Sequence, residues 1–449
     1  MRPSLPSLLR LQQTIIFVAL CLSIPSWPQA ANVTPGSIVS TPPDVTYFAV
    51  QGDTLSAIAK RFTDKLQNWH ILGRRNKITD DRTIPIGTAI VIPLELLPEE
   101  DSEAKVIAMA GSPTAKPVNG DEVPLSVGAI LKEGAQIVTG KNGFLTLSLS
   151  DDSRVSIPSN SQVSLTKLRK TRFTGSPRTQ ISLIQGKIES RVTSLISNKG
   201  RFEVRSPLAI AGVRGTHFRV GVNENGTANE VLTGGVAVEK SDQKKSDGLL
   251  LTAGKGNIIG VSGVGQAVDL LPPPTMETRY QLQERPTVVF NVNTTPAAKG
   301  YRVQIANDEA MQDVIAENRF TQNRFKFEGL SDGQYYVRIT AIDTLGLEGL
   351  PLVSSFRLKA RPEPPFSVEP KNKVRADHVD FSWTQASNAQ SYHLQVAKDA
   401  NFSQVVLDQA DITAVQLAGI KLPLGNYFWR VATIATTKTG KDQGPYGDT

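Results

Sequence analysis

The sequence has little cysteine, histidine, methionine or aromatic content. Its 449 residues include one cysteine, four histidines and four methionines, and aromatic residues make up 6%. The single cysteine, Cys21, excludes an intrachain disulfide, and the chain after it has no thiol that could act as a nucleophile. No two histidines stand at a metal-ligand spacing, so we expect no zinc peptidase chemistry, no metal and no cofactor. The histidines are His70, His217, His378 and His393.

A long apolar run and a strong charge surplus are also missing. The 49 Lys and Arg against 42 Asp and Glu give a net charge of +7, which argues against a nucleic-acid binder. The apolar run at residues 15–24 is about half of the ~20 residues that a membrane-spanning helix requires. Arg2 and Arg10 precede it and small residues follow up to Ala31, a pattern typical of a secretory leader. We expect a signal peptide at residues 1–31, no stable membrane span, and a periplasmic or cell-envelope location.

What the sequence does contain is a series of small modules. Residues 32–44 are rich in Pro, Ser and Thr and predict an unstructured linker. Residues 45–50 then alternate as a strand, and residues 55–62 carry apolar side chains at helical spacing. A second helical face and the strand at residues 89–93 follow, which predicts a strand-helix-helix-strand unit.

The phrases "YFAVQGDTLSAIAKRF", "NWHILGRRNKI" and "IPIGTAIVIP" occur in that order, and over residues 45–93 the chain resembles a LysM domain. LysM domains bind glycans that contain N-acetylglucosamine, chiefly peptidoglycan. The resemblance implies a shallow groove in which turn amides meet sugar acetamido groups and isoleucines meet sugar faces. A second interpretation is that Asp53 and Thr54 serve only as helix caps and that Leu55 belongs to the core. The expected glycan-binding residues are Gly52, Asp53, Thr54, Leu55, Asn76, Ile78, Ile84 and Ile86.

Residues 104–271 consist of short alternating segments separated by glycine and Asp/Asn/Ser clusters, which predicts an all-β domain. The phrases "IVTGKNGFLTLSLSDDSRVSI", "LIQGKI", "SPLAIAGVRGTHFRV" and "LTGGVAV" resemble the periplasmic domain of FecR-type regulators of iron transport. In that family an anti-sigma segment and a membrane helix usually precede the domain, and neither stands before it here. We therefore expect a scaffold or ligand-sensing role rather than transmembrane signalling.

Two features of this domain invite a functional interpretation. Arg214 and His217 lie in "GVRGTHF", where we expect Arg214 to bond carbonyls or a carboxylate locally and Gly212 and Gly215 to allow a tight turn or bulge. The run "KLRKTR" at residues 167–172 is compatible with anionic wall polymer, but a solvated loop is the prediction that we favour.

The last part of the chain, after "LLPPPT", repeats itself. The segment from Phe290 to Ala306 recurs ninety-one residues later, and "GQYYVR" recurs as "GNYFWR". Each copy has about seven strand-like segments and is similar to a fibronectin type III or immunoglobulin-like sandwich, at residues 276–360 and 361–449. The second copy ends with "TGKDQGPYGDT", so we expect it to lack its closing strand and to leave residues 427–436 as an open edge.

Enzyme signatures are present only as fragments. Ser164 to Lys167 reads S-x-x-K and residues 438–440 read K-T-G, but the first stands in an alternating segment where a transpeptidase needs a helix. The acidic pairs Asp80 with Asp81 and Asp151 with Asp152 stand in turn-like contexts. No Walker A or G-x-G-x-x-G sequence occurs.

The sequence therefore predicts a multidomain, mainly β, non-enzymatic envelope protein. It would bind peptidoglycan through the LysM domain and display the FecR-like domain and the sandwiches as a scaffold that meets an envelope protein partner. One alternative is a periplasmic sensor that uses the FecR-like domain, and another is an accessory of a cell-wall hydrolase. No nucleic acid is expected as a partner.

Overall fold

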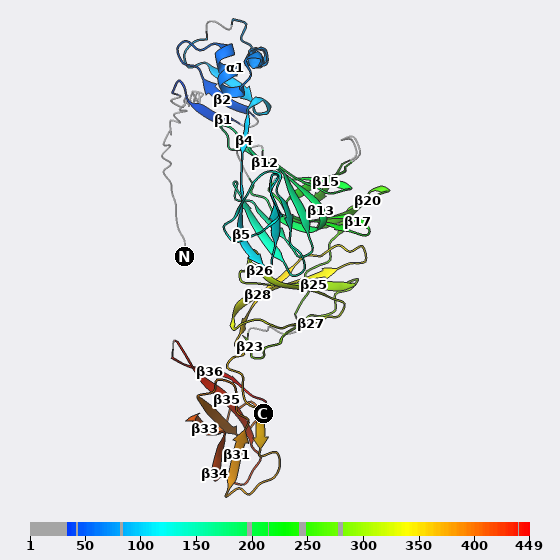
Figure 1. Cartoon of the computed structure of the whole chain (residues 1–449). Helices are drawn as coiled ribbons and strands as arrows, with labels where there is room; N and C mark the ends of the chain where they lie inside the picture. The colour runs from blue at the N-terminus through cyan, green and yellow to red at the C-terminus, as the bar shows by residue number, and fades with distance from the viewer. Residues whose placement is uncertain are drawn as a thin grey trace, which may run out of the picture. The chain divides into compact units, whose positions relative to one another are not determined.

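The computed structural model describes residues 34–41, 44–80, 84–194, 200–213, 215–241, 248–276, 282–438 and 440–449. Two compact units divide the chain, the first made mostly of residues 45–92 and the second mostly of residues 93–449 (Figure 1). The expected signal peptide and Arg214 lie outside the described residues. No helix in the described ranges is long and apolar enough to cross a membrane.

The first unit is the expected strand-helix-helix-strand module with one additional strand. The helices are α1 (Leu55–Thr63) and α2 (Trp69–Asn76), joined by the 3-10 turn η1 (Leu66–Asn68). The sheet has the order β1-β2-β3, from β1 (Ile38–Thr41), β2 (Asp44–Phe48) and β3 (Ala89–Pro93). Its core packs Tyr47 against Phe62, with ring centroids 4.7 Å apart.

The prediction of an unstructured linker at residues 32–44 is wrong for its second half. β1 occupies part of this range and lies beside β2. The β-branched pair Ile38 and Val39 favours an extended chain, and the free edge of β2 supplies hydrogen-bonding groups. The amide of Phe48 accordingly donates to the Ser37 carbonyl at 3.1 Å. Residues 38–41 thus form a strand because they pair with β2, although their composition alone indicated a linker.

In its described residues, the FecR-like domain is built of strands and short turns, as predicted. The turn η2 (Leu94–Leu96) leads into it. Its strands are β4 (Glu99–Asp101), β5 (Ala104–Ala110), β6 (Thr114–Lys116), β7 (Val123–Pro124), β8 (Ile130–Leu131), β9 (Gln136–Val138), β10 (Phe144–Leu149), β11 (Arg154–Ile157), β12 (Gln162–Thr171), β13 (Pro177–Arg191), β14 (Arg201–Arg205), β15 (Ala209–Val213), β16 (His217–Asn223), β17 (Gly226–Thr233), β18 (Gly235–Lys240), β19 (Leu249–Thr252), β20 (Lys255–Gly260), β21 (Gly263–Val264) and β22 (Val268–Asp269).

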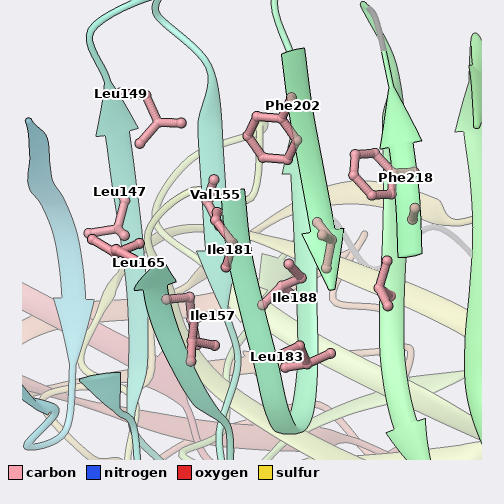
Figure 2. Close-up of a cluster of buried hydrophobic side chains, with 14 of the residues drawn as sticks. Leu147, Leu149, Val155, Ile157, Leu165, Ile181, Leu183, Ile188, Phe202 and Phe218 are labelled. Atoms are coloured by element: carbon pink, nitrogen blue, oxygen red, sulfur yellow. The ribbon is translucent and has the colours of Figure 1, made fainter. Parts of the chain in front are cut away.

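The long strand β13 joins two layers of this domain. Its first half pairs with β12 and, in parallel, with β14, whereas its second half pairs with β11 and β16. Gly186 marks the change between them, with φ of +83°, and a side chain there would meet the Asn160 carbonyl oxygen at 2.6 Å. The inward side chains of both layers, including Leu147, Ile181 and Phe202, form one apolar core (Figure 2).

Two smaller predictions in this domain need correction. Residues 167–171 of "KLRKTR" belong to strand β12, and only Arg172 lies in the turn that follows. The cations of this run pair with carboxylates of the domain, as when Lys167 meets Glu99 at 2.6 Å and Arg169 meets Glu133 at 2.7 Å.

Gly215 does adopt a positive φ of +58° after β15, but Gly212 lies within β15 as an ordinary strand residue. The same strand β12 holds Ser164 and Lys167 outside any helix, as the alternating pattern predicted.

Two β-sandwiches follow, each with seven strands among the described residues. The first contains β23 (Leu282–Gln283), β24 (Val288–Asn291), β25 (Gly300–Ala306), β26 (Val314–Phe320), β27 (Arg324–Phe327), β28 (Gly333–Ile342) and β29 (Leu352–Leu358). The second contains β30 (Ser367–Glu369), β31 (Val379–Trp383), β32 (Ser391–Ala397), β33 (Val405–Ile412), β34 (Gln416–Ile420), β35 (Phe428–Thr437) and β36 (Gly440–Tyr446). The larger sheets have the orders β23-β29-β28-β25-β26 and β33-β32-β35-β36.

The prediction that the second sandwich lacks its closing strand is wrong. Strand β36 pairs antiparallel with β35, with Thr436 opposite Lys441 and Ala432 opposite Tyr446. The chain turns back at once after β35, whereas the first copy uses a longer loop before β29, and glycine and polar residues in "TGKDQGPYGDT" concealed the strand. Strand β35 is therefore covered on both sides, by β32 and by β36.

Candidate functional site

The turn that precedes α1 contains the first two expected glycan-binding residues. Gly52 has a φ of +84° and Asp53 closes the turn, because its Oδ2 accepts hydrogen bonds from the Val50 amide at 2.8 Å and the Tyr47 hydroxyl at 2.6 Å. Burial and the neighbouring Asp53 carboxylate both raise the pKa of Tyr47, which keeps its hydroxyl protonated as the donor. Asp53 therefore has a structural role, and only its other oxygen is left for an external donor.

The next two expected residues begin helix α1. Thr54 is the N-cap, and its Oγ1 accepts a hydrogen bond from the Ala57 amide at 3.1 Å. Leu55 is buried in the core, so it cannot present its side chain to a ligand. The amides of Leu55 and Ser56 lie in the first turn, where no intrahelical carbonyl can accept from them. The second interpretation made from the sequence, caps and core, thus describes the side chains of both residues.

Asn76 connects α2 to β3. Its Nδ2 donates to the Leu72 carbonyl at 2.9 Å and to the Val91 carbonyl at 2.8 Å. Its Oδ1 accepts from the Val91 amide at 2.7 Å. Three backbone partners occupy the amide group, so the side chain stabilises the module and has little capacity left for a glycan.

The three isoleucines differ in exposure. Ile84 is buried, Ile78 is partly buried, and Ile86 is 59% exposed. Hydrogen bonds fix the loop of Ile86 beside the strand that leads into the first turn: the Gly87 amide donates to the Ala49 carbonyl at 2.7 Å, and the Ala49 amide donates to the Thr88 carbonyl at 3.0 Å. The loop that contains Ile84 and Ile86 is thus held beside Ala49, just before the turn at Gly52. Ile86 is an exposed apolar side chain on this loop.

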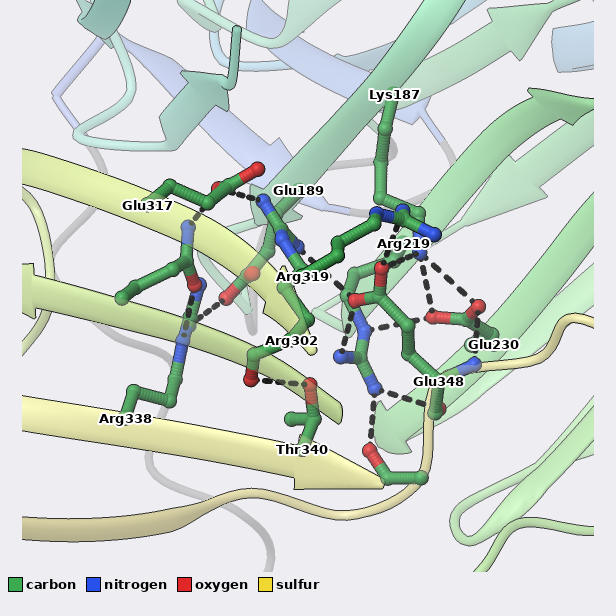
Figure 3. Close-up of polar contacts among 12 residues, drawn as sticks. Lys187, Glu189, Arg219, Glu230, Arg302, Glu317, Arg319, Arg338, Thr340 and Glu348 are labelled. Carbon is green, nitrogen blue, oxygen red and sulfur yellow. Dashed lines mark hydrogen bonds and ion pairs between the residues drawn. The ribbon is translucent and has the colours of Figure 1, made fainter. Parts of the chain in front are cut away.

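A second polar cluster, not expected from the sequence, joins the FecR-like domain to the first sandwich (Figure 3). At its centre is Glu348, which follows β28 and is fully buried. Four cations meet its carboxylate: Lys187 at 3.1 Å and Arg219 at 3.1 Å from the FecR-like domain, and Arg302 at 2.9 Å and Arg319 at 3.2 Å from the sandwich. Burial raises the pKa of Glu348, but these cations outweigh it and hold the pKa well below its ordinary value.

Glu189 forms the other part of the cluster. Its Oε1 accepts from Arg338 Nη1 of the sandwich at 2.8 Å and lies 2.8 Å from His217 Nε2. Burial raises the pKa of Glu189, but Arg338 and His217 lower it by more, so the pKa lies well below its ordinary value. His217 thus contacts a carboxylate of its own domain. These charged residues alternate along strands, which is also the pattern of a solvated face, so the sequence carried no signal of their burial.

A polar cavity of about 440 Å³ opens at this junction. Its lining includes the cations Lys141, Lys187, Arg302 and Arg319, the amide of Asn160 and the carboxylate of Glu317. Its volume is within the range of about 300–1,000 Å³ that small-molecule sites occupy. A metal site has no support, because no group of three or more His, Cys, Asp or Glu gathers within the described part of the chain.

Comparison with known proteins identifies two domains. The LysM domain model matches residues 49–93, and the FecR protein model matches residues 135–237. Both resemblances noted in the sequence are thereby confirmed, and no enzyme family is indicated. Comparison with curated proteins found no match.

Three solved structures are similar to this chain at low identity. Two crystal structures of candidate anti-sigma factors from Parabacteroides distasonis ATCC 8503 have 18% and 16% identity and TM-scores of 0.24 and 0.25. The aligned parts cover 30% and 33% of this chain and 59% and 77% of those chains, so the first is spanned over less than two thirds of its length. The chicken CNTN1 FN1–FN3 domains have 12% identity and a TM-score of 0.21, with 54% of this chain and 92% of that chain covered. Scores this low carry no argument.

Proposed function

We propose that this chain is a non-enzymatic protein of the bacterial cell envelope that binds peptidoglycan through residues 45–93 and holds the FecR-like domain and the sandwiches at the wall. The match of residues 49–93 to the LysM domain carries the proposal. The loop arrangement supports it, since the exposed Ile86 lies on a loop that is hydrogen-bonded to Ala49, from which the chain passes through the Gly52 turn into α1. The N-terminal segment, typical of a secretory leader, supports export.

The side chains divide the expected site into two groups. Ile86 and the backbone around Gly52 are accessible to a sugar, with one oxygen of Asp53 as a further acceptor. Thr54, Leu55, Asn76 and Ile84 shape the groove from within. A shallow surface of this size gives modest affinity, about micromolar to millimolar, and the remaining modules would add partners or avidity.

Sedimentation with purified sacculi tests the proposal. The chain without residues 1–31 is expected to co-sediment, and Ile86→Ser is expected to reduce the bound fraction without lowering the melting temperature, because this side chain is 59% exposed. Ile71→Ser is the matched control, since Ile71 is also exposed but lies on α2, outside the two loops. A folded chain that stays in the supernatant at every loading would refute wall binding.

A sensor function is the second candidate, and the cavity between the FecR-like domain and the first sandwich favours it. In its lining, Lys141 and the 61% exposed Arg319 offer cations to a small anionic ligand. A rise in melting temperature with a panel of small anions, lost in Lys141→Ser, would support this candidate. A hydrolase accessory is the third, and faster lysis of sacculi by an added wall hydrolase in the presence of the purified chain would favour it over both.

A further inference from the structure

The two sandwiches present the same constellation on equivalent faces. In the first, Gln304 of β25 is opposite Arg338 of β28, and in the second, Gln395 of β32 is opposite Arg430 of β35. Arg338 donates from Nε and Nη2 to Gln304 Oε1 at 2.8 and 2.5 Å. Arg430 donates from the same atoms to Gln395 Oε1 at 3.1 and 2.8 Å. In both copies the glutamine thus fixes the guanidinium through Nε and Nη2, and Nη1 is not bonded to the glutamine.

In the first copy this face is a docking surface. Met311 and Val314 of the sandwich pack with Phe144 of the FecR-like domain in one apolar cluster. Arg338 Nη1 donates to Glu189 of the FecR-like domain at 2.8 Å. The docked occupant is therefore a β-sheet surface that offers an aromatic side chain and a carboxylate.

The second copy keeps the chemistry but has no occupant among the described residues. Val405 is 39% exposed, whereas its counterpart Val314 is 7% exposed. Phe428, the counterpart of Tyr336, is 38% exposed. The second docking face, as we name it, consists of the exposed Val405 and Phe428 with Arg430, over the buried Ala397 and Phe402.

Arg430 is held rigidly on this face. Its guanidinium carbon lies 3.9 Å from the Phe402 ring centroid and 4.1 Å from that of Tyr446. Stacking between two rings and the bonds to Gln395 leave Nη1 without a hydrogen-bond partner in the described part of the chain. A planar donor fixed in this way loses little freedom when it meets a carboxylate.

We propose that the second docking face binds a separate protein, which presents a β-sheet surface with a carboxylate for Arg430 beside an apolar or aromatic side chain for Val405 and Phe428. The first copy shows the complementary chemistry, and the charge of Arg430 requires it. A second copy of this chain is disfavoured because its matching surface is already covered: Glu189 is 6% exposed and Phe144 is 4% exposed.

Site-specific photo-crosslinking in the native host tests the proposal, with the full chain carrying a benzophenone side chain at Val405. The expected result is one protein adduct whose crosslinked peptide lies on a strand near an Asp or Glu. A benzophenone at Val368, which is 37% exposed on the opposite sheet, is the control position. With the purified partner, Arg430→Glu is expected to raise the Kd at least about thirtyfold, as breaking a desolvated charge pair does.

Matched variants separate docking from folding. Arg375→Glu changes a fully exposed arginine of the same sandwich and should leave the Kd unchanged. Val405→Lys should weaken binding without lowering the melting temperature, and reversing the partner carboxylate to arginine should restore binding to Arg430→Glu. Adducts with a glycan or with a second copy, equal adducts from Val405 and Val368, or equal Kd values for the two arginine variants would overturn the proposal.

Discussion

Replacing Glu348 by Gln tests whether the buried cluster holds the FecR-like domain and the first sandwich together. The substitution preserves side-chain volume but removes the anion that Lys187, Arg219 and Arg302 share at 2.9 to 3.1 Å. Glu348 is fully buried and Arg219 is 1% exposed, so water cannot replace the lost charge. The amide end of glutamine would also direct donors at groups that are themselves donors.

The expected cost is about 3–5 kcal/mol, the usual penalty for breaking a buried ion pair by removing one partner. At about 2–4 °C per kcal/mol for a unit of some 150–250 residues, the melting temperature should fall by about 6–20 °C. The assay is a thermal melt of the chain without residues 1–31. Arg319 is not the source of the effect, because its side chain is 61% exposed and such pairs contribute about 0–1 kcal/mol.

Glu328→Gln is the matched control, because it makes the same chemical change at an exposed position of the same sandwich. Its melting temperature should stay within about 2 °C of the unchanged chain, since exposed substitutions alter stability by about 0.5 kcal/mol. If Glu348→Gln has the same melting temperature as Glu328→Gln, the cluster makes no net contribution to stability and the reasoning is refuted.

Two further predictions concern pH and the LysM module. The folded pKa values of Glu189 and Glu348 lie below the ordinary carboxyl value, so their stabilisation is complete above about pH 4.3 and is lost as the pH falls through the folded values. Melting temperatures between pH 7 and 3 should therefore drop more steeply at the acid end for the unchanged chain than for Glu348→Gln, and equal slopes would contradict the assignment. Asn76→Ala should destabilise the LysM module by about 1–3 kcal/mol, because it leaves Val91 groups without partners, and hydrogen exchange of β3 measures this. Unchanged exchange at Val91 would show that water replaces the side chain.

The sequence by itself determined the order and type of the modules. Helical spacing at residues 55–62 and alternation along "FLTLSLS" and "ISLIQGKIESRV" are local properties, because the period of the apolar residues sets which face is buried. The repeat of Phe290 to Ala306 likewise specified two copies of one sandwich. These features need no knowledge of what each module contacts.

Only the tertiary structure decided which polar residues are buried. The sequence pattern around Glu348 and Arg219 is that of solvent-exposed residues. They are buried because one sandwich docks on the FecR-like domain. Asn76 and Asp53 carry glycan-binding chemistry in the sequence but are used mainly for backbone bonds. Strand β36 was missed because an edge with unsatisfied amides and carbonyls orders even a polar, glycine-containing segment. For Glu348, Arg219 and Asn76, a partner distant in the sequence determines the role, and no local pattern can encode that partner.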